Sequence, residues 1–177
     1  MPAAASIAPE SVSDSHVTAR VPQTAPTSSR PLRVLLVEDN EDSMLLVKYA
    51  LEEFGDGKYV LDWADRLYPG LERLQYGNVD VTLLDLGLPE TNGPDTFFAV
   101  RNANPKVPVI VLTADECTQT EYAVTSFGAD EYLVKGEVSG SVLANAISDV
   151  IRRRKSRGAH PGTFKDLRIC QRGVPGE

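Results

Sequence analysis

Polar side chains stand at the ends of four of the five short apolar segments of this sequence. Glu38 and Asp39 end the first segment, Asp85 the third, Thr113 the fourth and Lys135 the fifth. If the segments are parallel strands, their carboxyl ends lie along one edge of a sheet, where ligands bind in such folds. The sequence therefore predicts that three carboxylates, a hydroxyl and an ammonium group meet at one place.

A chemical task can be assigned to each of these groups. Clustered carboxylates repel one another and attract a hard cation such as Mg²⁺, for which Glu38 and Asp39 are candidate ligands. Asp85, at the centre, can attack phosphorus to form an aspartyl-phosphate, with a metal ion neutralising the developing charge. Lys135 would supply a positive charge on the side opposite the metal, and the Thr113 hydroxyl could donate to a phosphoryl oxygen.

Each residue taken alone has a simpler explanation. Asp39 could cap a helix, Lys135 could be a solvated surface lysine, and Thr113 is an ordinary β-branched strand residue. The joint placement of these groups at four strand ends favours the phosphoacceptor hypothesis over the separate explanations.

Short apolar runs alternate with helical patterns between residues 32 and 154. Nearly continuous apolar character predicts strands that are buried on both faces. The predicted strands cover residues 32–38, 58–64, 80–86, 107–113 and 131–135. Five such strand–helix units predict an α/β fold, a doubly wound five-stranded parallel sheet with helices on both faces and the flavodoxin-like order 2-1-3-4-5.

Local signals mark where the helices begin and end. Asn40 is a predicted N-cap, the glycines of 55–57 end the first helix, and Gly93 with Pro94 opens the third. The helix predicted for 117–127 is weak, because it contains several β-branched residues. The last helix is expected to bury one face, formed by Val142, Leu143, Ala146, Ile147, Val150 and Ile151.

The net charge of −7 is unevenly distributed along the 177 residues. Residues 1–30 are neutral and residues 151–177 carry +6, so residues 31–150 carry −13. An acidic centre suits cation binding and argues against nucleic-acid binding there. No secretory signal or apolar run of membrane-spanning length is present, and Cys117 and Cys170 do not form a disulfide framework. We expect a cytoplasmic protein with no membrane association.

Composition predicts three regions. Residues 1–31 are rich in Ala, Ser, Pro and Thr and predict a disordered leader. Residues 32–154 are expected to form the domain, and residues 155–177 a flexible basic tail. Because this tail is short and rich in Gly and Pro, we expect it to form no second effector domain.

Four stretches resemble the receiver domain of the response regulators of two-component signal transduction. They occur in the family's order, and together with the last helix the resemblance covers residues 32–154. The stretches are RVLLVEDNED, DVTLLDLGLPETNG, VPVIVLTADE and GADEYLVKG.

The resemblance implies that Asp85 is phosphorylated, with Mg²⁺, by a sensor histidine kinase or a phosphotransfer protein. It implies direct metal ligation by Asp39, Asp85 and the backbone carbonyl of Gly87, with Glu38 acting largely through water. The protein would be no enzyme beyond catalysing its own phosphorylation and dephosphorylation.

The resemblance also implies a switch made of Thr113 and Tyr132. In the family, the hydroxyl moves toward the phosphoryl group and the aromatic ring rotates inward behind it. The output surface for a downstream protein would then be the face formed by the fourth helix, the fifth strand and the fifth helix. As a stand-alone receiver, the chain would act through protein contacts or as a phosphorelay intermediate.

Three positions depart from or vary within the family's pattern. Gly136 follows Lys135 where the family commonly has proline, which puts the path of this loop in question. Gly87 and Asp115, each two residues after a site residue, occupy positions at which the family tunes the lifetime of the phosphoryl group.

Other functions remain as alternatives. An aspartate-nucleophile phosphatase would want a second acid at Gly87, and a phosphorylation-independent interaction scaffold would not need the full set of site residues. Nucleic-acid binding by the basic stretch 152–157 is disfavoured, since basic residues at a helix C-terminus complement its dipole. Dinucleotide binding is disfavoured because no glycine-rich fingerprint follows the first strand.

Overall fold

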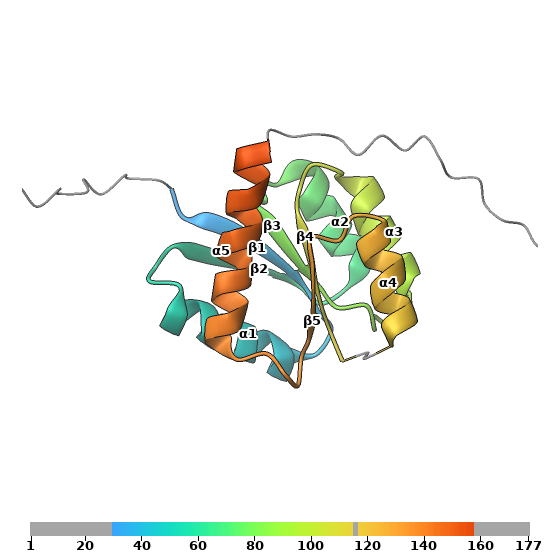
Figure 1. Cartoon of the computed structure of the whole chain (residues 1–177), viewed down its shortest axis with the longest axis horizontal. Helices are drawn as coiled ribbons and strands as arrows, with labels where there is room; N and C mark the ends of the chain where they lie inside the picture. The colour runs from blue at the N-terminus through green and yellow to red at the C-terminus, as the bar shows by residue number, and fades with distance from the viewer. Residues whose placement is uncertain (1–29, 115–116, 158–177) are drawn as a thin grey trace, which may run out of the picture.

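A computed structural model describes residues 30–114 and 117–157 of the chain. Five strands alternate with five helices in this part of the chain, as the sequence predicts (Figure 1). The elements, in chain order, are β1 (Leu32–Val37), α1 (Glu41–Phe54), β2 (Tyr59–Ala64), α2 (Leu67–Tyr76), β3 (Val81–Leu84), α3 (Pro94–Ala103), β4 (Val109–Thr113), α4 (Thr118–Ser126), β5 (Glu131–Val134) and α5 (Gly140–Arg157).

All paired strands run parallel, in the order β2-β1-β3-β4-β5. This confirms the predicted fold class and strand order. The three central strands are almost completely buried, which explains why their sequences are apolar without alternation.

Each face of the sheet has its own core. Helices α1 and α5 cover one face, where Val47, Leu51 and Ile147 pack on alternate residues of the central strands. Helices α2, α3 and α4 cover the other, where Phe97 and Val124 are fully buried (Figure 1). Helices on both faces leave the strand ends as the accessible edges of the sheet.

Two glycines allow helices to lie close to their neighbours. A Cβ atom on Gly70 of α2 would lie 2.8 Å from a methyl carbon of Val37, and one on Gly140 of α5 would lie 2.8 Å from the ring of Phe54. A side chain at either position would push the helix away from its partner.

Helix α5 differs in two respects from the sequence prediction. It continues to Arg157, so the predicted domain boundary at residue 154 falls inside the helix. The prediction that Val142 belongs to the buried face was wrong, because Val142 is 48% exposed whereas Leu143 is buried. Apart from Arg30 and Pro31 and the end of α5, the predicted leader and tail lie outside the described residues, as do Asp115 and Cys170.

None of the helices in the described part of the chain combines the length and apolar character that crossing a bilayer requires.

Candidate functional site

The candidate site lies at the carboxyl ends of β1, β3, β4 and β5. Pairing of Val37 with Leu84 places the residues that follow β1 and β3 side by side. Pairing of Thr113 with Val134 does the same for the ends of β4 and β5. The sheet register therefore brings Glu38, Asp39, Asp85, Thr113 and Lys135 to one edge, as the sequence predicts.

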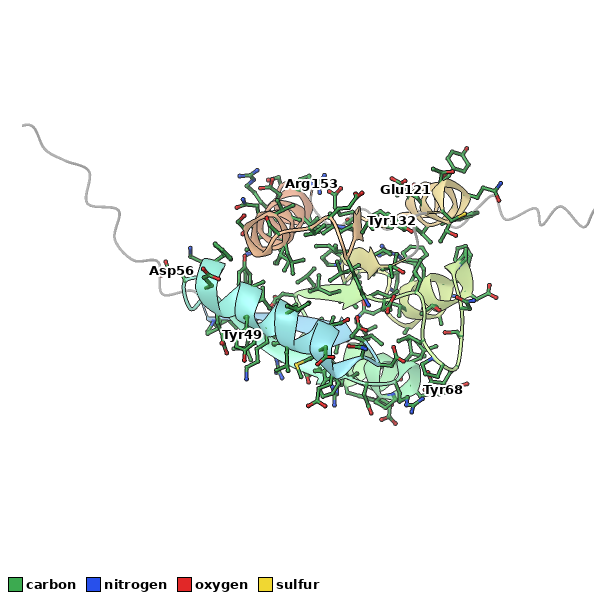
Figure 2. The ribbon with its side chains drawn as sticks, turned by 90° about the horizontal axis from the view of Figure 1, so that it is seen from below. Tyr49, Asp56, Tyr68, Glu121, Tyr132 and Arg153 are labelled. Carbon is green, nitrogen blue, oxygen red and sulfur yellow. The ribbon has the colours of Figure 1, made fainter. Side chains whose placement is uncertain are left out.

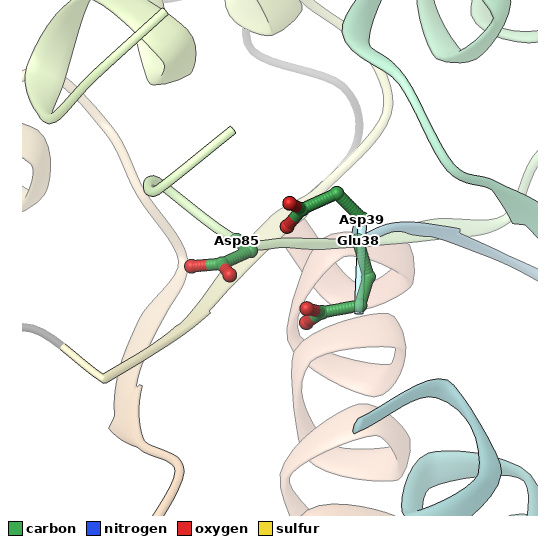
Figure 3. A group of neighbouring side chains, drawn as sticks. All are labelled: Glu38, Asp39 and Asp85. Atoms are coloured by element: carbon green, nitrogen blue, oxygen red, sulfur yellow. The ribbon is translucent and has the colours of Figure 1, made fainter. Parts of the chain in front are cut away.

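Three of these residues form a compact acidic cluster (Figure 3). One carboxylate oxygen each from Glu38, Asp39 and Asp85 lies within 4.8 Å of the other two. Glu38 and Asp85 are buried, whereas Asp39 is exposed. Oxygen donors at this spacing could hold a metal ion, and an exposed third ligand would leave it open to solvent and to a further ligand.

Backbone groups orient the two buried acids. The amide of Asn40 donates to Glu38 Oε1 at 3.2 Å, and the amide of Gly87 donates to Asp85 Oδ1 at 3.1 Å. The indole of Trp63 donates to the backbone oxygen of Glu38 at 2.7 Å. Asn40 also caps α1, as predicted, by accepting from the amide of Ser43. The cap is therefore Asn40 and not Asp39, which leaves the Asp39 carboxylate for the cluster.

Lys135 provides the positive charge of the site. Its Nζ lies 2.7 Å from Asp85 Oδ2, to which it donates a hydrogen bond. The same Nζ lies 2.6 Å from Glu38 Oε2, in an ion pair rather than an oriented hydrogen bond. The pairing of Lys135 with Glu38 was not predicted from the sequence. With all four groups ionised, three carboxylates face one ammonium, so the cluster keeps an excess negative charge that a divalent cation would neutralise.

Burial and charge act in opposite directions on this ion pair. Burial raises the pKa of the Glu38 carboxyl above its ordinary value, and the Lys135 ammonium only partly counteracts this. Burial by itself would lower the pKa of Lys135, but the contacts with Asp85 and Glu38 outweigh it and raise the pKa. The Lys135 ammonium therefore stays protonated at neutral pH and favours the ionised form of Glu38 against the effect of burial.

Thr113 and Tyr132 lie on the neighbouring strands β4 and β5. Thr113 is buried, and its backbone oxygen accepts from the amide of Lys135 at 2.9 Å. Tyr132 is partly buried, packs against the core on the α2–α3–α4 face and pairs with Val111 in the sheet. Figure 2 shows Tyr132 between Glu121 of α4 and Arg153 of α5. Their roles as a switch stay predictions.

The two glycines that depart from or vary within the family's pattern lie in ordinary surroundings. A Cβ atom on Gly136 would have no atom within 4 Å, and its φ is not in the left-handed region. Gly136 therefore needs no unusual backbone angle to place Lys135. A Cβ atom on Gly87 would meet only Asp85 Oδ1, at 3.8 Å. Gly87 therefore places no side chain beside the Asp85 carboxylate.

One residue near the site was missed by the sequence analysis. Thr96 is fully buried in the first turn of α3, and its hydroxyl donates to the backbone oxygen of Leu86 at 3.1 Å. The only sequence signal is a threonine directly before the buried Phe97. The path of the preceding loop is needed to recognise its partner.

Comparison with known proteins agrees with this geometry. A model of the response regulator receiver domain matches residues 34–148. The transcriptional regulatory protein CusR of Escherichia coli (strain K12) is 32% identical over 122 residues, which cover 69% of this chain and 52% of CusR. The cell cycle transcriptional regulator CtrA of Caulobacter vibrioides is 29% identical over 124 residues, covering 70% of this chain and 52% of CtrA. The chain spans about half the length of these two relatives.

Solved structures show the same fold. A CheY-like receiver domain protein from Methanospirillum hungatei JF-1 matches with a TM-score of 0.65 and 23% identity, covering 72% of this chain and 99% of that chain. A receiver domain from Clostridium thermocellum matches with a TM-score of 0.62 and 26% identity, covering 71% and 98%. Since the family model spans well over half of the sequence, this chain belongs to the response regulator receiver domain family.

Proposed function

We propose that Asp85 is the phosphoacceptor of a two-component signalling pathway. A sensor histidine kinase or a phosphotransfer protein would supply the phosphoryl group. A carboxylate oxygen of Asp85 attacks the phosphorus, the phosphorus–nitrogen bond of the phosphohistidine breaks, and its electron pair remains on the imidazole. The observation that supports this best is the convergence of Glu38, Asp39 and Lys135 around one partly accessible aspartate.

The donor set fits Mg²⁺. Asp39 and Asp85, with the backbone carbonyl of Gly87, would hold the ion, and Glu38 would act largely through water. The bound ion would neutralise charge on the phosphoryl oxygens. Lys135 already contacts Asp85 Oδ2, so its ammonium is close enough to offset charge that accumulates beside that carboxylate.

Phosphorylation would be transmitted by Thr113 and Tyr132 to the face formed by α4, β5 and α5. A phosphoryl group adds negative charge and acceptor oxygens that the Thr113 hydroxyl could reach only after a change in packing. We infer that this face contacts a downstream protein. The named relatives include transcriptional regulators, so the sequence argument against nucleic acid stays a prediction.

The test is chemical phosphorylation followed by intact mass measurement. With acetyl phosphate or phosphoramidate and Mg²⁺, we expect a gain of one phosphoryl group, absent in Asp85→Asn and absent with a chelator. Asp65→Asn is the matched control, because Asp65 also follows a strand but lies outside the acidic cluster. This variant should label normally.

Two other outcomes would point to the alternative functions. Steady turnover of a small phosphomonoester without labelling would favour an aspartate-nucleophile phosphatase. Absence of both labelling and turnover in the wild-type protein would favour an interaction scaffold.

A further inference from the structure

The loop that follows Asp85 is tied down by two threonine hydroxyls. The hydroxyl of Thr96 donates to the backbone oxygen of Leu86 at 3.1 Å, and the Thr91 and Thr96 hydroxyl oxygens lie 2.8 Å apart. The amide of Gly93 donates to the same Leu86 oxygen at 3.0 Å. Thr96 is completely buried, so water cannot replace these hydrogen-bond partners of its hydroxyl.

The direction of the hydroxyl pair follows from a count of hydrogens. A threonine hydroxyl has one hydrogen to donate and can accept as well. Because Thr96 gives its hydrogen to Leu86, Thr91 must be the donor in the pair with Thr96. Thr91, Thr96 and the Leu86 carbonyl thus form a relay in which each hydrogen bond strengthens the next.

This relay ends on the peptide group that orients the phosphoacceptor. The carbonyl of Leu86 and the amide of Gly87 belong to one peptide unit, which is planar and moves as a rigid body. Donors hold its oxygen, and its N–H donates to Asp85 Oδ1 at 3.1 Å. Holding the carbonyl therefore sets the direction of the N–H, and the N–H fixes one oxygen of Asp85 while Lys135 holds the other.

We propose that Thr96, assisted by Thr91, is a positioning residue for the Asp85 carboxylate and for the Gly87 carbonyl that follows it. The inference rests on the proposed phosphoacceptor function. Its specific claim is that loss of one hydroxyl, at a position without contact to the reacting atoms, slows phosphorylation of a protein that is still folded.

A purely structural role for Thr96 makes a different prediction. If the side chain only filled space in the core, valine would replace it without effect on the chemistry, since the two side chains have nearly the same shape. Serine would then be the poorer replacement, because it leaves a methyl-sized void. The positioning role predicts the opposite order.

The experiment compares Thr96→Val with Thr96→Ser in the full chain. We measure the initial rate of phosphorylation by phosphoramidate at saturating Mg²⁺, and the Gly87 amide resonance by ¹⁵N NMR. We expect Thr96→Val to be about tenfold slower than wild type, because a misplaced reacting group costs rate steeply, and Thr96→Ser to be within about twofold. The Gly87 amide resonance should shift in the valine variant and stay near its wild-type position in the serine variant.

Thr82 provides a matched control. It is also completely buried, on β3, but among the described residues its hydroxyl has no hydrogen-bond partner. Thr82→Val makes the same chemical change without breaking a hydrogen bond, so its phosphorylation rate should equal that of wild type. If Thr96→Val fails to fold, Thr91→Val, which leaves the bond from Thr96 to Leu86 in place, should still slow phosphorylation by about threefold by weakening the relay.

Several results would overturn the inference. A wild-type rate in Thr96→Val, a serine variant as slow as the valine variant, or an equal loss in Thr82→Val would each show that the hydroxyl does not position Asp85. If Thr96→Val does not fold, a wild-type rate in Thr91→Val has the same meaning. Failure of the wild-type protein to label at all would instead refute the proposed function.

Discussion

Lys135 is shared between two buried acids, and its removal should make the domain depend on a metal ion. In Lys135→Met, Glu38 and Asp85 lose an ammonium that lies 2.6 and 2.7 Å from them. Removing one partner of a buried ion pair lowers the unfolding free energy by about 3–5 kcal/mol. We expect the lower end, about 3 kcal/mol, because Lys135 keeps 21% of its side-chain surface in water and Glu38, whose pKa is raised by burial, can take up a proton.

Mg²⁺ should reverse part of this loss. A cation in the acidic cluster competes with the ammonium for the same carboxylates, so we expect binding to the variant to be about tenfold tighter. At a concentration 100-fold above the wild-type dissociation constant, Mg²⁺ would stabilise the wild type by about 2.7 kcal/mol and the variant by about 1.4 kcal/mol more. Mg²⁺ would thus close about half of the gap in unfolding free energy between Lys135→Met and wild type.

Urea unfolding, followed by the fluorescence of Trp63, measures the unfolding free energy of wild type and Lys135→Met in chelator and in Mg²⁺. Trp63 is the single tryptophan of the sequence. Lys58→Met is the control, since Lys58 and Asp56 form an exposed pair at 3.6 Å that should contribute less than about 0.5 kcal/mol. A Mg²⁺ increment in Lys135→Met no larger than in wild type would refute the claim that lysine and metal share these acids.

Two further predictions concern the framework of the site. Gly70→Ala should lower the unfolding free energy by about 1–2 kcal/mol in urea, since its Cβ would lie 2.8 Å from Val37 next to the acidic cluster. Gly136→Ala, which meets no atom, should be neutral, and an equal loss in both would contradict the packing argument. Asp130→Asn should lower the unfolding free energy by about 3 kcal/mol in thermal or urea unfolding, because the Asp130 carboxylate neutralises the buried guanidinium of Arg101 in α3. Asp149→Asn, which breaks an exposed pair, should change stability by less than about 0.5 kcal/mol, and similar losses in the two variants would refute this reasoning.

The sequence predicted the sheet and most of the candidate site for a simple physical reason. Strands buried on both faces are almost wholly apolar, so a charged residue that follows such a run marks the end of the strand. Glu38, Asp85 and Lys135 were recognisable in this way, and the parallel order of the strands then brought them together.

The rest depended on contacts between distant segments. The domain boundary predicted at residue 154 falls inside α5, which continues to Arg157 and is held there by contacts with β5. Arg154 holds Asp130 through two hydrogen bonds of 2.7 and 2.8 Å, and Arg153 contacts Glu131 at 3.1 Å. Both ion pairs hold the C-terminal part of α5 against the start of β5.

The sequence also could not show which distant groups a given side chain contacts. Lys135 was expected beside Asp85, but its second contact, with Glu38, depends on the direction of that buried side chain, which the Asn40 amide helps to fix. Thr96 was overlooked for the same kind of reason. Its partner lies ten residues earlier, across a loop that closes through Gly93, whose φ of +61° favours glycine.

The way the neighbouring elements are anchored suggests where a signal from Asp85 would go. Strand β5 is tied to β4 at both ends, by the Lys135 amide on Thr113 and by the Asp130 amide on Val109. Helix α4 is tied far less firmly, since Val124 is its one buried residue. A phosphoryl group that drew Thr113 toward it would therefore displace α4 before it displaced β5. That asymmetry favours α4 as the movable part of the proposed output face and β5 as the fixed part against which it would move.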